Sequence, residues 1–384
     1  MEITALALNR STLARQLLLE RAALPVEDVV KRVVALQAQQ PASPYVALWN
    51  RVAGFEAAAL DALYADFRVV KSTLMRITLH AVHADDYREF RAAVEPTVRG
   101  ARLRDRRFTA SGLTETDAAA LLPELLSLAE RPCGARELGE WLAGRAGVDA
   151  VAVRPAWRML RQWAPLWHAP VAGAPWGFTS DSRQGFVAAR GALPDLADAR
   201  AVEAGLGALI RRYLEGFGPA SVADMAQFGL VQKGRVRAAL GADLVELAGP
   251  GGQVFYDVPG RDLPAEDVPA PPRLMAMWDS VLLAYADRGR VVPPEYRKHV
   301  TRVNGDVLPT VLVDGYVAGV WRTVDGGGVE VGAFRPLPAA VWEALEEEAR
   351  GLRRLLGERD ETAYRRYDHW WAKGLPVAET RLFA

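Results

Sequence analysis

Three glutamines stand within four positions of the segment LQAQQP, at Gln37, Gln39 and Gln40. They follow an apolar stretch from Val29 to Leu36, which we expect to be helical, and Pro41 comes directly after them. A side-chain amide accepts hydrogen bonds at its oxygen and donates them at its nitrogen, so a pair of amides can hold a water molecule or the edge of a base. The alternative interpretation is a polar helix end without any chemical role.

Motifs for most other chemistries do not occur in the chain. The sequence contains no GxGxxG, GxxxxGK[ST], GxSxG, HExxH or CxxC pattern. His80 and His83 are three residues apart, but His80 is expected on a strand, so this spacing is poor support for a metal pair. The single cysteine, Cys133, excludes a disulfide within the chain. We therefore expect no metal and no cofactor.

The overall charge limits the kind of partner. Lys+Arg and Asp+Glu each number 47 among 384 residues, so the net charge is zero and any nucleic-acid surface must be a local arrangement. Neither a signal peptide nor an apolar stretch long enough to cross a membrane is visible, so we expect a cytoplasmic protein without membrane contact. We also expect it to be a monomer.

Two segments are locally basic and are candidate DNA contacts. The first, 98–108, contributes Arg99, Arg102, Arg104, Arg106 and Arg107 against one acid. The second, 287–302, contributes Arg288, Arg290, Arg297, Lys298 and Arg302 against two acids. Either segment alone could be a solvated helix face, but two of them on one scaffold favour phosphate binding.

The elements that position the glutamines follow a recognisable order. Helices are expected at Ser11–Arg21 (capped by Asn9 or Ser11), from Pro25 to about Gln37, from Ser43 onward and at Glu56–Tyr64. The segment RVVKSTLMRITLHAV then alternates like two strands with a turn near Met75. Short helices followed by a hairpin are the order of a winged helix, in which the hairpin is the wing.

The same order returns twice. Helices are expected from Thr114 or Thr116 to about Glu130, then at Ala135–Arg145 and Arg154–Trp163, followed by a hairpin in LWHAPVAGAPWGFTS. A third set comprises Ala201–Glu215, Ser221–Phe228, Lys233–Leu240 and a hairpin in LVELAGPGGQVFYDV that turns at Gly249–Gly252. The sequence thus predicts a mainly α fold with small β wings (α+β), built from three tandem winged-helix units.

The C-terminal third has a different pattern. A proline-rich linker, Val258–Arg273, leads to an antiparallel sheet with turns at Asp314-Gly315 and Gly326–Gly328, and then to an amphipathic helix, Pro338–Gly357. The expected domains are therefore 1–110 with the glutamine motif, 111–198, 199–260, and 261–384 with the linker, sheet and last helices.

Three stretches of the chain carry a family resemblance. They are LQAQQPASPYVALWNRV, LMRITLHAVHADDY, and MWDSVLLAYADRGRVVPPEYRKHV with GDVLPTVLVDGYVAGVWR. The chain resembles the winged-helix DNA glycosylases that unhook DNA interstrand crosslinks. Its Gln-x-Gln form is similar to the azinomycin-resistance branch, whereas a sister branch has Gln-x-Asp. The resemblance implies a concave DNA-binding surface, Gln37 and Gln39 at the reaction centre, and excision of N7-alkylated purines without a cofactor.

Amides are chemically sufficient for such a substrate. An N7-alkylated purine already carries a positive charge, so it leaves as a neutral molecule without being protonated. The enzyme must hold a water at C1′ and offer oxygen dipoles to a cationic sugar, and two amides can do both. The lysine closest to the motif in sequence is Lys31, about two turns earlier, so we expect neither Schiff-base formation nor strand cleavage, and a monofunctional enzyme that leaves an abasic site. Thr78 and His80 either face the site or are structural.

The predicted function is hydrolysis of the N-glycosidic bond of N7-alkylated purines, including interstrand crosslinks, in DNA repair or self-resistance. The partner is double-stranded DNA with alkylated or crosslinked purines. One alternative is a winged-helix regulator that binds DNA without catalysis. Another is a protein that sequesters an alkylating drug.

Overall fold

A computed structural model describes residues 2–179, 183–191 and 198–384. Its first helix, α1 (Ala5–Arg15), begins at Thr4, whose hydroxyl accepts from the Ala7 amide. The predicted helix Ser11–Arg21 was therefore placed too late. Asn9 lies buried inside α1 and donates to the carbonyls of Arg290 and Gly315. Its polarity suggested a cap, but it serves long-range packing.

The first unit has the order helix, short strand, helix, helix, hairpin. Its elements are α2 (Val26–Arg32), β1 (Leu36–Gln37), α3 (Ser43–Trp49), α4 (Ala57–Ala65), β2 (Val69–Thr73), the 3-10 turn η1 (Met75–Ile77) and β3 (Leu79–His83). The three strands are antiparallel in the order β1-β3-β2. The predicted hairpin and its turn near Met75 are confirmed.

The second helix is shorter than predicted, and this changes the setting of the glutamines. It ends at Arg32, Val33 forms its C-terminal cap, and Val34 has a φ of 73°, which reverses the chain. Leu36 and Gln37 then pair with Ala81 and His80 of β3. Valine-rich sequence before the motif fits a strand entrance as well as a helix. The glutamines therefore lie on and after an edge strand and not at a helix end.

The second unit repeats the order. Its elements are α7 (Glu115–Leu128), β4 (Cys133–Gly134), α8 (Ala135–Ala146), α9 (Arg154–Trp163), β5 (Leu166–Ala169) and β6 (Gly185–Ala188). The strand order β4-β6-β5 matches that of the first unit. The three helices were predicted, and Thr114 with Asp117 forms a capping box at α7. The hairpin was expected within 166–180, but β5 pairs with a strand at 185–188. Residue 180 of that segment lies outside the described residues.

The third unit contains α10 (Ala199–Phe217), α11 (Val222–Gly229), α12 (Lys233–Ala238), β7 (Val245–Ala248) and β8 (Val254–Asp257), with η2 (Pro250–Gly252) at the turn. Ala220 bridges to Tyr256 of β8 and takes the place that a short strand has in the other units. These helices and the hairpin confirm the prediction. Two helices between the first and second units, α5 (Ala84–Leu103) and α6 (Arg106–Thr109), were not predicted.

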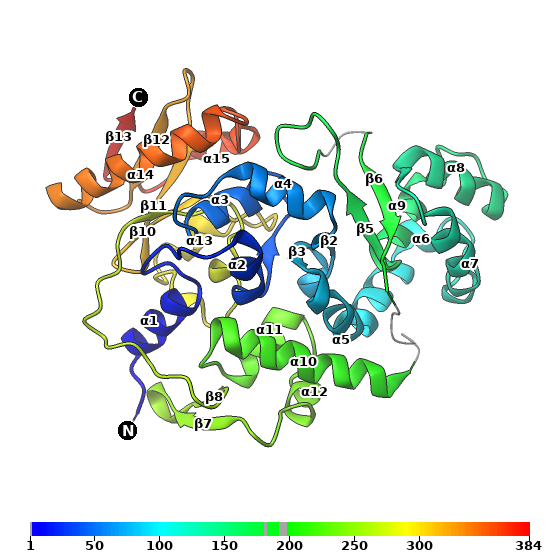
Figure 1. Cartoon of the computed structure of the whole chain (residues 1–384), viewed down its shortest axis with the longest axis horizontal. Helices are drawn as coiled ribbons and strands as arrows, with labels where there is room; N and C mark the ends of the chain where they lie inside the picture. Colours follow the sequence, from blue (N-terminus) through cyan, green and yellow to red (C-terminus); the bar gives the residue numbers. More distant parts are fainter. Residues whose placement is uncertain (1, 180–182, 192–197) are drawn as a thin grey trace.

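The C-terminal part is a five-stranded antiparallel sheet covered by a long helix (Figure 1). The strands are β9 (Arg273–Leu274), β10 (Thr310–Val313), β11 (Tyr316–Thr323), β12 (Val329–Ala333) and β13 (Glu379–Phe383), and the helix is α14 (Ala339–Gly357). Short turns of helix complete it: η3 (Ser280–Leu282), η4 (Arg288–Arg290), α13 (Arg297–Val300), η5 (Arg365–Tyr367) and α15 (His369–Ala372). The central hairpins and α14 were predicted, whereas the edge strands β9 and β13 were not.

The C-terminal part packs against the first unit and supports the glutamine strand. The carboxylate of Asp279 forms a bidentate ion pair with Arg51, and both side chains are fully buried. The next residue, Ser280, donates its hydroxyl to the carbonyl of Ala35, directly before β1.

Among the described residues, none of the helices combines the length and the apolar character that a membrane span requires.

Candidate functional site

Gln37 is a buried residue with both ends of its side-chain amide in use. Its Nε2 donates to the Thr78 hydroxyl at 3.1 Å, and its Oε1 accepts from the backbone amide of Gln39 at 3.0 Å. The Thr78 hydroxyl in turn donates to the Met75 carbonyl at 3.2 Å. Gln37 thus ties β1 to the hairpin turn and fixes the backbone from which Gln39 projects.

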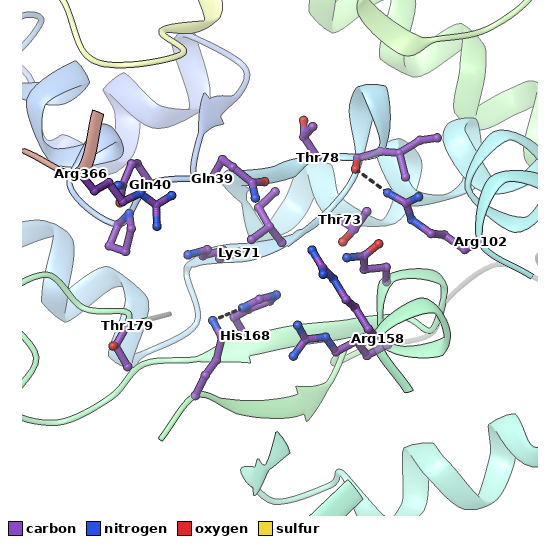
Figure 2. Close-up of a pocket in the computed structure, with 16 residues that line it drawn as sticks. Gln39, Gln40, Lys71, Thr73, Thr78, Arg102, Arg158, His168, Thr179 and Arg366 are labelled. Atoms are coloured by element: carbon purple, nitrogen blue, oxygen red, sulfur yellow. Dashed lines mark hydrogen bonds between the residues drawn. The ribbon is translucent and has the colours of Figure 1, made fainter. Parts of the chain in front are cut away.

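Gln39 has the opposite environment. It is exposed and lines a cavity of about 420 Å³ between the first and second units (Figure 2). Within the described residues, its side-chain amide forms no hydrogen bond. The amide is therefore available to hold a water or a substrate atom in the cavity.

The walls of this cavity are polar and strongly basic. They contain five cationic side chains and, among the residues that the structure describes, no aspartate or glutamate. The lining residues are Gln39, Gln40, Pro41, Lys71, Thr73, Ile77, Thr78, Leu79, Arg102, Arg158, Arg161, Gln162, His168, Thr179, Gln184 and Arg366. A general base of the carboxylate kind is thus missing from the described walls.

His80 lies behind the cavity wall and does not line it. Its Nε2 is 3.2 Å from the Arg76 guanidinium and its Nδ1 is 3.1 Å from the Thr78 carbonyl. Because a guanidinium only donates, Nε2 must accept and Nδ1 must carry the proton. Burial, and next the charge of Arg76, lower the pKa of His80 to about 3. The ring is therefore neutral, and it positions the turn that presents Thr78.

Lys71 of β2 lies in the same cavity as Gln39 (Figure 2). Its side chain is 3% exposed, and Nζ lies 4.5 Å from the centroid of the Phe178 ring. No carboxylate of the described residues lies within ion-pair distance of Nζ. Burial lowers the pKa of Lys71 to about 7. The sequence analysis missed this lysine because it considered only lysines close to the glutamines along the chain.

Arginines of two helices face the cavity from the other side (Figure 2). Arg102 comes from α5 and donates to the Ile77 carbonyl at 3.3 Å, while its buried Nε has no partner among the described residues. Arg158 and Arg161 come from α9 of the second unit, and neither forms an ion pair within the described part of the chain. Burial, followed by the charge of Arg158, lowers the pKa of Arg161 to about 10. Such unpaired guanidinium groups are suited to phosphate.

Comparison with known proteins places the chain in a family. The family model described as "DNA glycosylase AlkZ-like" matches residues 30–355. The chain belongs to the AlkZ-like DNA glycosylases. It is 27% identical over 363 residues to the interstrand DNA cross-link repair glycosylase of Streptomyces sahachiroi, covering 89% of this chain and 94% of that protein.

A solved structure shows the same fold. The DNA glycosylase AlkZ of Streptomyces sahachiroi superposes with a TM-score of 0.77 at 24% identity, over 93% of this chain and 98% of that chain. The two proteins therefore share their fold over nearly the whole length of this chain.

The first basic segment of this AlkZ-like glycosylase is divided by the structure. Only Arg102 reaches the cavity. Three others form ion pairs: Arg99 with Glu95 at 2.8 Å, Arg104 with Glu115 at 2.6 Å, and Arg107 with Asp105 at 2.6 Å. Arg106 is exposed on α6. An ion pair neutralises part of the charge of each of these three arginines. The folded segment is therefore less positively charged than its sequence suggests.

The second basic segment lies away from the cavity, because none of its cations lines it. Arg290 is largely buried, donates to the Pro219 carbonyl at 2.8 Å and stacks on the Tyr285 ring. Arg288 donates to the Thr301 hydroxyl, and Arg302 lies over the Trp370 ring. Arg297 and Lys298 are exposed on α13. The two segments therefore do not form one continuous site around Gln39.

Metal binding has no geometric support in the described residues, which contain no cluster of three or more His, Cys, Asp or Glu side chains able to hold an ion. The two imidazoles nearest the cavity, those of His80 and His168, are both buried, and burial lowers the pKa of each. His168 is also 2.8 Å from the Gln184 amide. The functional groups in the described cavity walls are therefore mainly side-chain amides, arginine guanidinium groups and the amine of one lysine.

Proposed function

We propose that this chain is a monofunctional DNA glycosylase that hydrolyses the N-glycosidic bond of N7-alkylated purines, including those in interstrand crosslinks. The observation that carries the proposal is the Gln39 amide, which is free of described partners in a cavity whose described walls hold no carboxylate. A neutral lesion needs an acid or a carboxylate to leave, whereas an N7-alkylated purine does not. The similar Streptomyces sahachiroi protein is named as an interstrand cross-link repair glycosylase, which supports the same substrate class.

The proposed mechanism assigns separate tasks to the two glutamines. The Gln39 carbonyl oxygen holds the attacking water and faces the positive charge that develops on the sugar, while Gln37 fixes the backbone of Gln39. Thr78 acts by positioning Gln37. His80, which is neutral, positions Thr78 and takes no proton from the water.

The positive charge of the cavity walls suits a negatively charged ligand such as the DNA backbone. Without phosphates nearby, five cations would repel both a cationic purine and a cationic sugar. We propose that backbone phosphates of the DNA are bound by Arg102, Arg158 and Arg161, which neutralises the cavity when the substrate enters. The exposed Arg104, Arg106, Arg107, Arg297 and Lys298 would add contacts farther along the duplex.

The three repeated units suit this binding. We propose that they are winged helices with boundaries near 1–110, 111–198 and 199–260, followed by the C-terminal part 261–384, and that together they form a concave DNA surface. The shared strand order supports this assignment. A concave surface accommodates a crosslinked base, which is tethered to the partner strand and cannot be swung out of the duplex alone.

The decisive experiment uses duplex DNA with a single N7-methylguanine. The protein is incubated with it, abasic sites are converted to breaks by alkali, and the products are separated on a denaturing gel. We expect release well above the spontaneous rate. Release at the spontaneous rate would contradict the enzyme and leave a DNA-binding regulator. Unhooking is tested on a duplex with an N7–N7 mustard crosslink, by loss of the slow-migrating crosslinked species. An azinomycin crosslink in place of the mustard tests the proposed role in self-resistance.

A further inference from the structure

A buried lysine in the cavity is not explained by the proposed hydrolysis. Lys71 is 3% exposed, packs over Phe178 and lies in a basic environment that includes His168 and Arg161. A methionine or leucine would fill this space without burying an amine, which is costly when no partner compensates it. Lys71 and Thr73, two residues apart on β2, both face the cavity, so the strand presents the amine to the site.

We propose that Lys71 captures the abasic sugar, left after base excision, as an imine at C1′. This inference rests on the proposed function, because it takes the sugar to lie beside Gln39. The capture would be a second, covalent activity of the same cavity, directed at an aldehyde. It would retain the reactive abasic product until a later repair enzyme replaces the protein.

The strand arrangement places the amine within reach of such a sugar. β3 separates β1 from β2, and His80 of β3 is paired with Gln37 on one side and Ser72 on the other. Two strand spacings put Gln37 and Ser72 about 10 Å apart. Gln39 lies two residues after Gln37, and Lys71 lies directly before Ser72. Both side chains line the same cavity (Figure 2). A sugar held between them lies within the reach of a four-carbon side chain.

The state of the amine suits the reaction. Burial lowers the pKa of Lys71 to about 7, so a substantial fraction of the amine is neutral at physiological pH. A neutral amine is the nucleophile in imine formation, whereas an ammonium is inert. The nearby guanidinium groups stay protonated under the same conditions and cannot replace it.

The proposed step is balanced without a further reagent. The abasic sugar opens to its aldehyde, and the Nζ lone pair of Lys71 forms a bond to C1′ to give a carbinolamine. The hydroxyl group leaves as water with the remaining proton of the amine nitrogen, and a neutral imine remains, which takes a proton from solvent. Water reverses the step and releases the aldehyde and the amine.

We expect capture without strand cleavage. Cleavage by β-elimination needs a base that removes a C2′ proton, and the described cavity walls contain no carboxylate. The Nδ1 atom of His168 is engaged with the Gln184 amide. The imine should therefore return to the aldehyde by hydrolysis, which agrees with a monofunctional glycosylase.

Borohydride trapping tests the proposal. Full-length protein is mixed with duplex DNA that carries a preformed abasic site, and cyanoborohydride is added to reduce any imine to a stable amine. We expect a protein–DNA adduct on a denaturing gel, with the DNA attached to Lys71 by peptide mass mapping. Lys71→Arg and Lys71→Met should each lower the adduct at least tenfold. Lys31→Met, at an exposed lysine paired with Asp85, is the matched control and should leave it unchanged.

Binding and excision are measured beside the trapping. If Lys71→Arg binds abasic DNA as the wild type does and yet forms no adduct, the amine itself is required. Absence of an adduct with wild-type protein that binds the duplex would overturn the proposal, and so would an adduct that persists in Lys71→Met. Because the abasic site is preformed, failure of N7-methylguanine excision would be seen separately, and it would count against the proposed hydrolysis alone.

Discussion

Gln37 and Gln39 are two residues apart and have the same side chain, but their surroundings give them different roles. Gln37 is buried between Thr78 and the Gln39 backbone, whereas the Gln39 amide lies open to the cavity. The spacing of the pair was visible in the sequence, and the family resemblance made it a candidate site. The different roles of the two residues could not be predicted from the sequence, because they depend on the strand pairing of β1 with β3.

Substitution should separate the two glutamines. Gln39→Ala should lower the excision rate on N7-methylguanine by about 10- to 1000-fold, or about 1.4–4 kcal/mol of barrier, with an unchanged melting temperature. Gln37→Ala should lower the rate and also cost about 1–3 kcal/mol of stability, because two buried hydrogen bonds lose a partner. The double variant should fall short of the summed loss in rate, since Gln37 acts through Gln39.

Gln39→Asp is the matched control, because a carboxylate accepts the same hydrogen bond from water. It should retain most of the excision activity. Single-turnover excision rates and melting temperatures are measured for the two alanine variants, the double variant and Gln39→Asp. Wild-type rates in Gln39→Ala would show that this amide only lines the cavity.

Lys71 should also make stability depend on pH. The pKa of Lys71 is about 7 in the folded protein against 10.5 ordinarily, so between these values the unfolded chain binds more protons than the folded one. The free energy of unfolding should therefore rise with pH from about 7 toward 10, by about 1.4 kcal/mol for each unit between the two pKa values. Urea unfolding of wild type and Lys71→Met at several pH values measures this.

The comparison between the two proteins isolates the lysine, because other groups titrate in both. Lys71→Met should be more stable than the wild type near pH 7, and the difference should shrink as the pH rises. A difference that stays constant from pH 7 to pH 10 would mean that the amine is not desolvated as its burial suggests.

At the scale of elements, α9 is the helix that brings the second unit to the site. It was predicted at its observed bounds, Arg154–Trp163. That Arg158 and Arg161 face the same cavity as Gln39, which follows β1, could not be predicted, because these residues are more than a hundred positions apart. Sequence patterns report the face of a helix and not its distant neighbour.

The helix-borne arginines lead to a binding prediction. Arg158→Ala and Arg161→Ala should each weaken DNA binding on any sequence and reduce the slope of log Kd against log salt by about one for each lost phosphate contact. Arg350→Ala, at an exposed i,i+4 ion pair with Glu346 on α14, is the control and should change both quantities much less. Salt titrations by fluorescence anisotropy measure the effect. Equal effects of all three would show that the cavity has no special role in phosphate binding.

Element boundaries failed in the sequence analysis where long-range contacts decide them. Thr4 caps α1, whereas Asn9, the predicted cap, is used in tertiary packing. α2 ends at Arg32 because Val34 reverses the chain into β1. β9 and β13 are edge strands that are defined by their partners β10 and β12. Long amphipathic helices and tight hairpins were predictable because their information is local.

At the scale of the molecule, the repeated units and the C-terminal part share one core. Buried apolar residues from Leu13 to Trp370 form a continuous cluster. In Figure 1 the C-terminal sheet lies beside the first unit, on the side away from the second. The contact of Ser280 with the Ala35 carbonyl connects this part to the glutamine strand. The C-terminal part therefore acts as a support for the site, although none of its strands lines the cavity.

The buried pair Arg51–Asp279 tests this long-range support. Both side chains are essentially inaccessible, and the Asp279 carboxylate also accepts from the Val281 amide at 3.1 Å. Arg51→Met leaves an unpaired buried carboxylate and should cost about 3–5 kcal/mol of stability. Adding Asp279→Asn removes that charge while it keeps an acceptor for Val281, so the double variant should be more stable than Arg51→Met alone.

Arg350→Met is the control for the pair, because Arg350 is exposed on α14 and its ion pair with Glu346 should contribute little to stability. Urea unfolding of the four proteins gives the comparison, and excision rates measured well below each midpoint show whether the glutamine strand stays in place. If the C-terminal part supports β1, Arg51→Met should lose excision activity even where it is still folded, because Ser280 then no longer holds the Ala35 carbonyl. A folded Arg51→Met protein with the wild-type rate would show that the C-terminal part contributes stability alone.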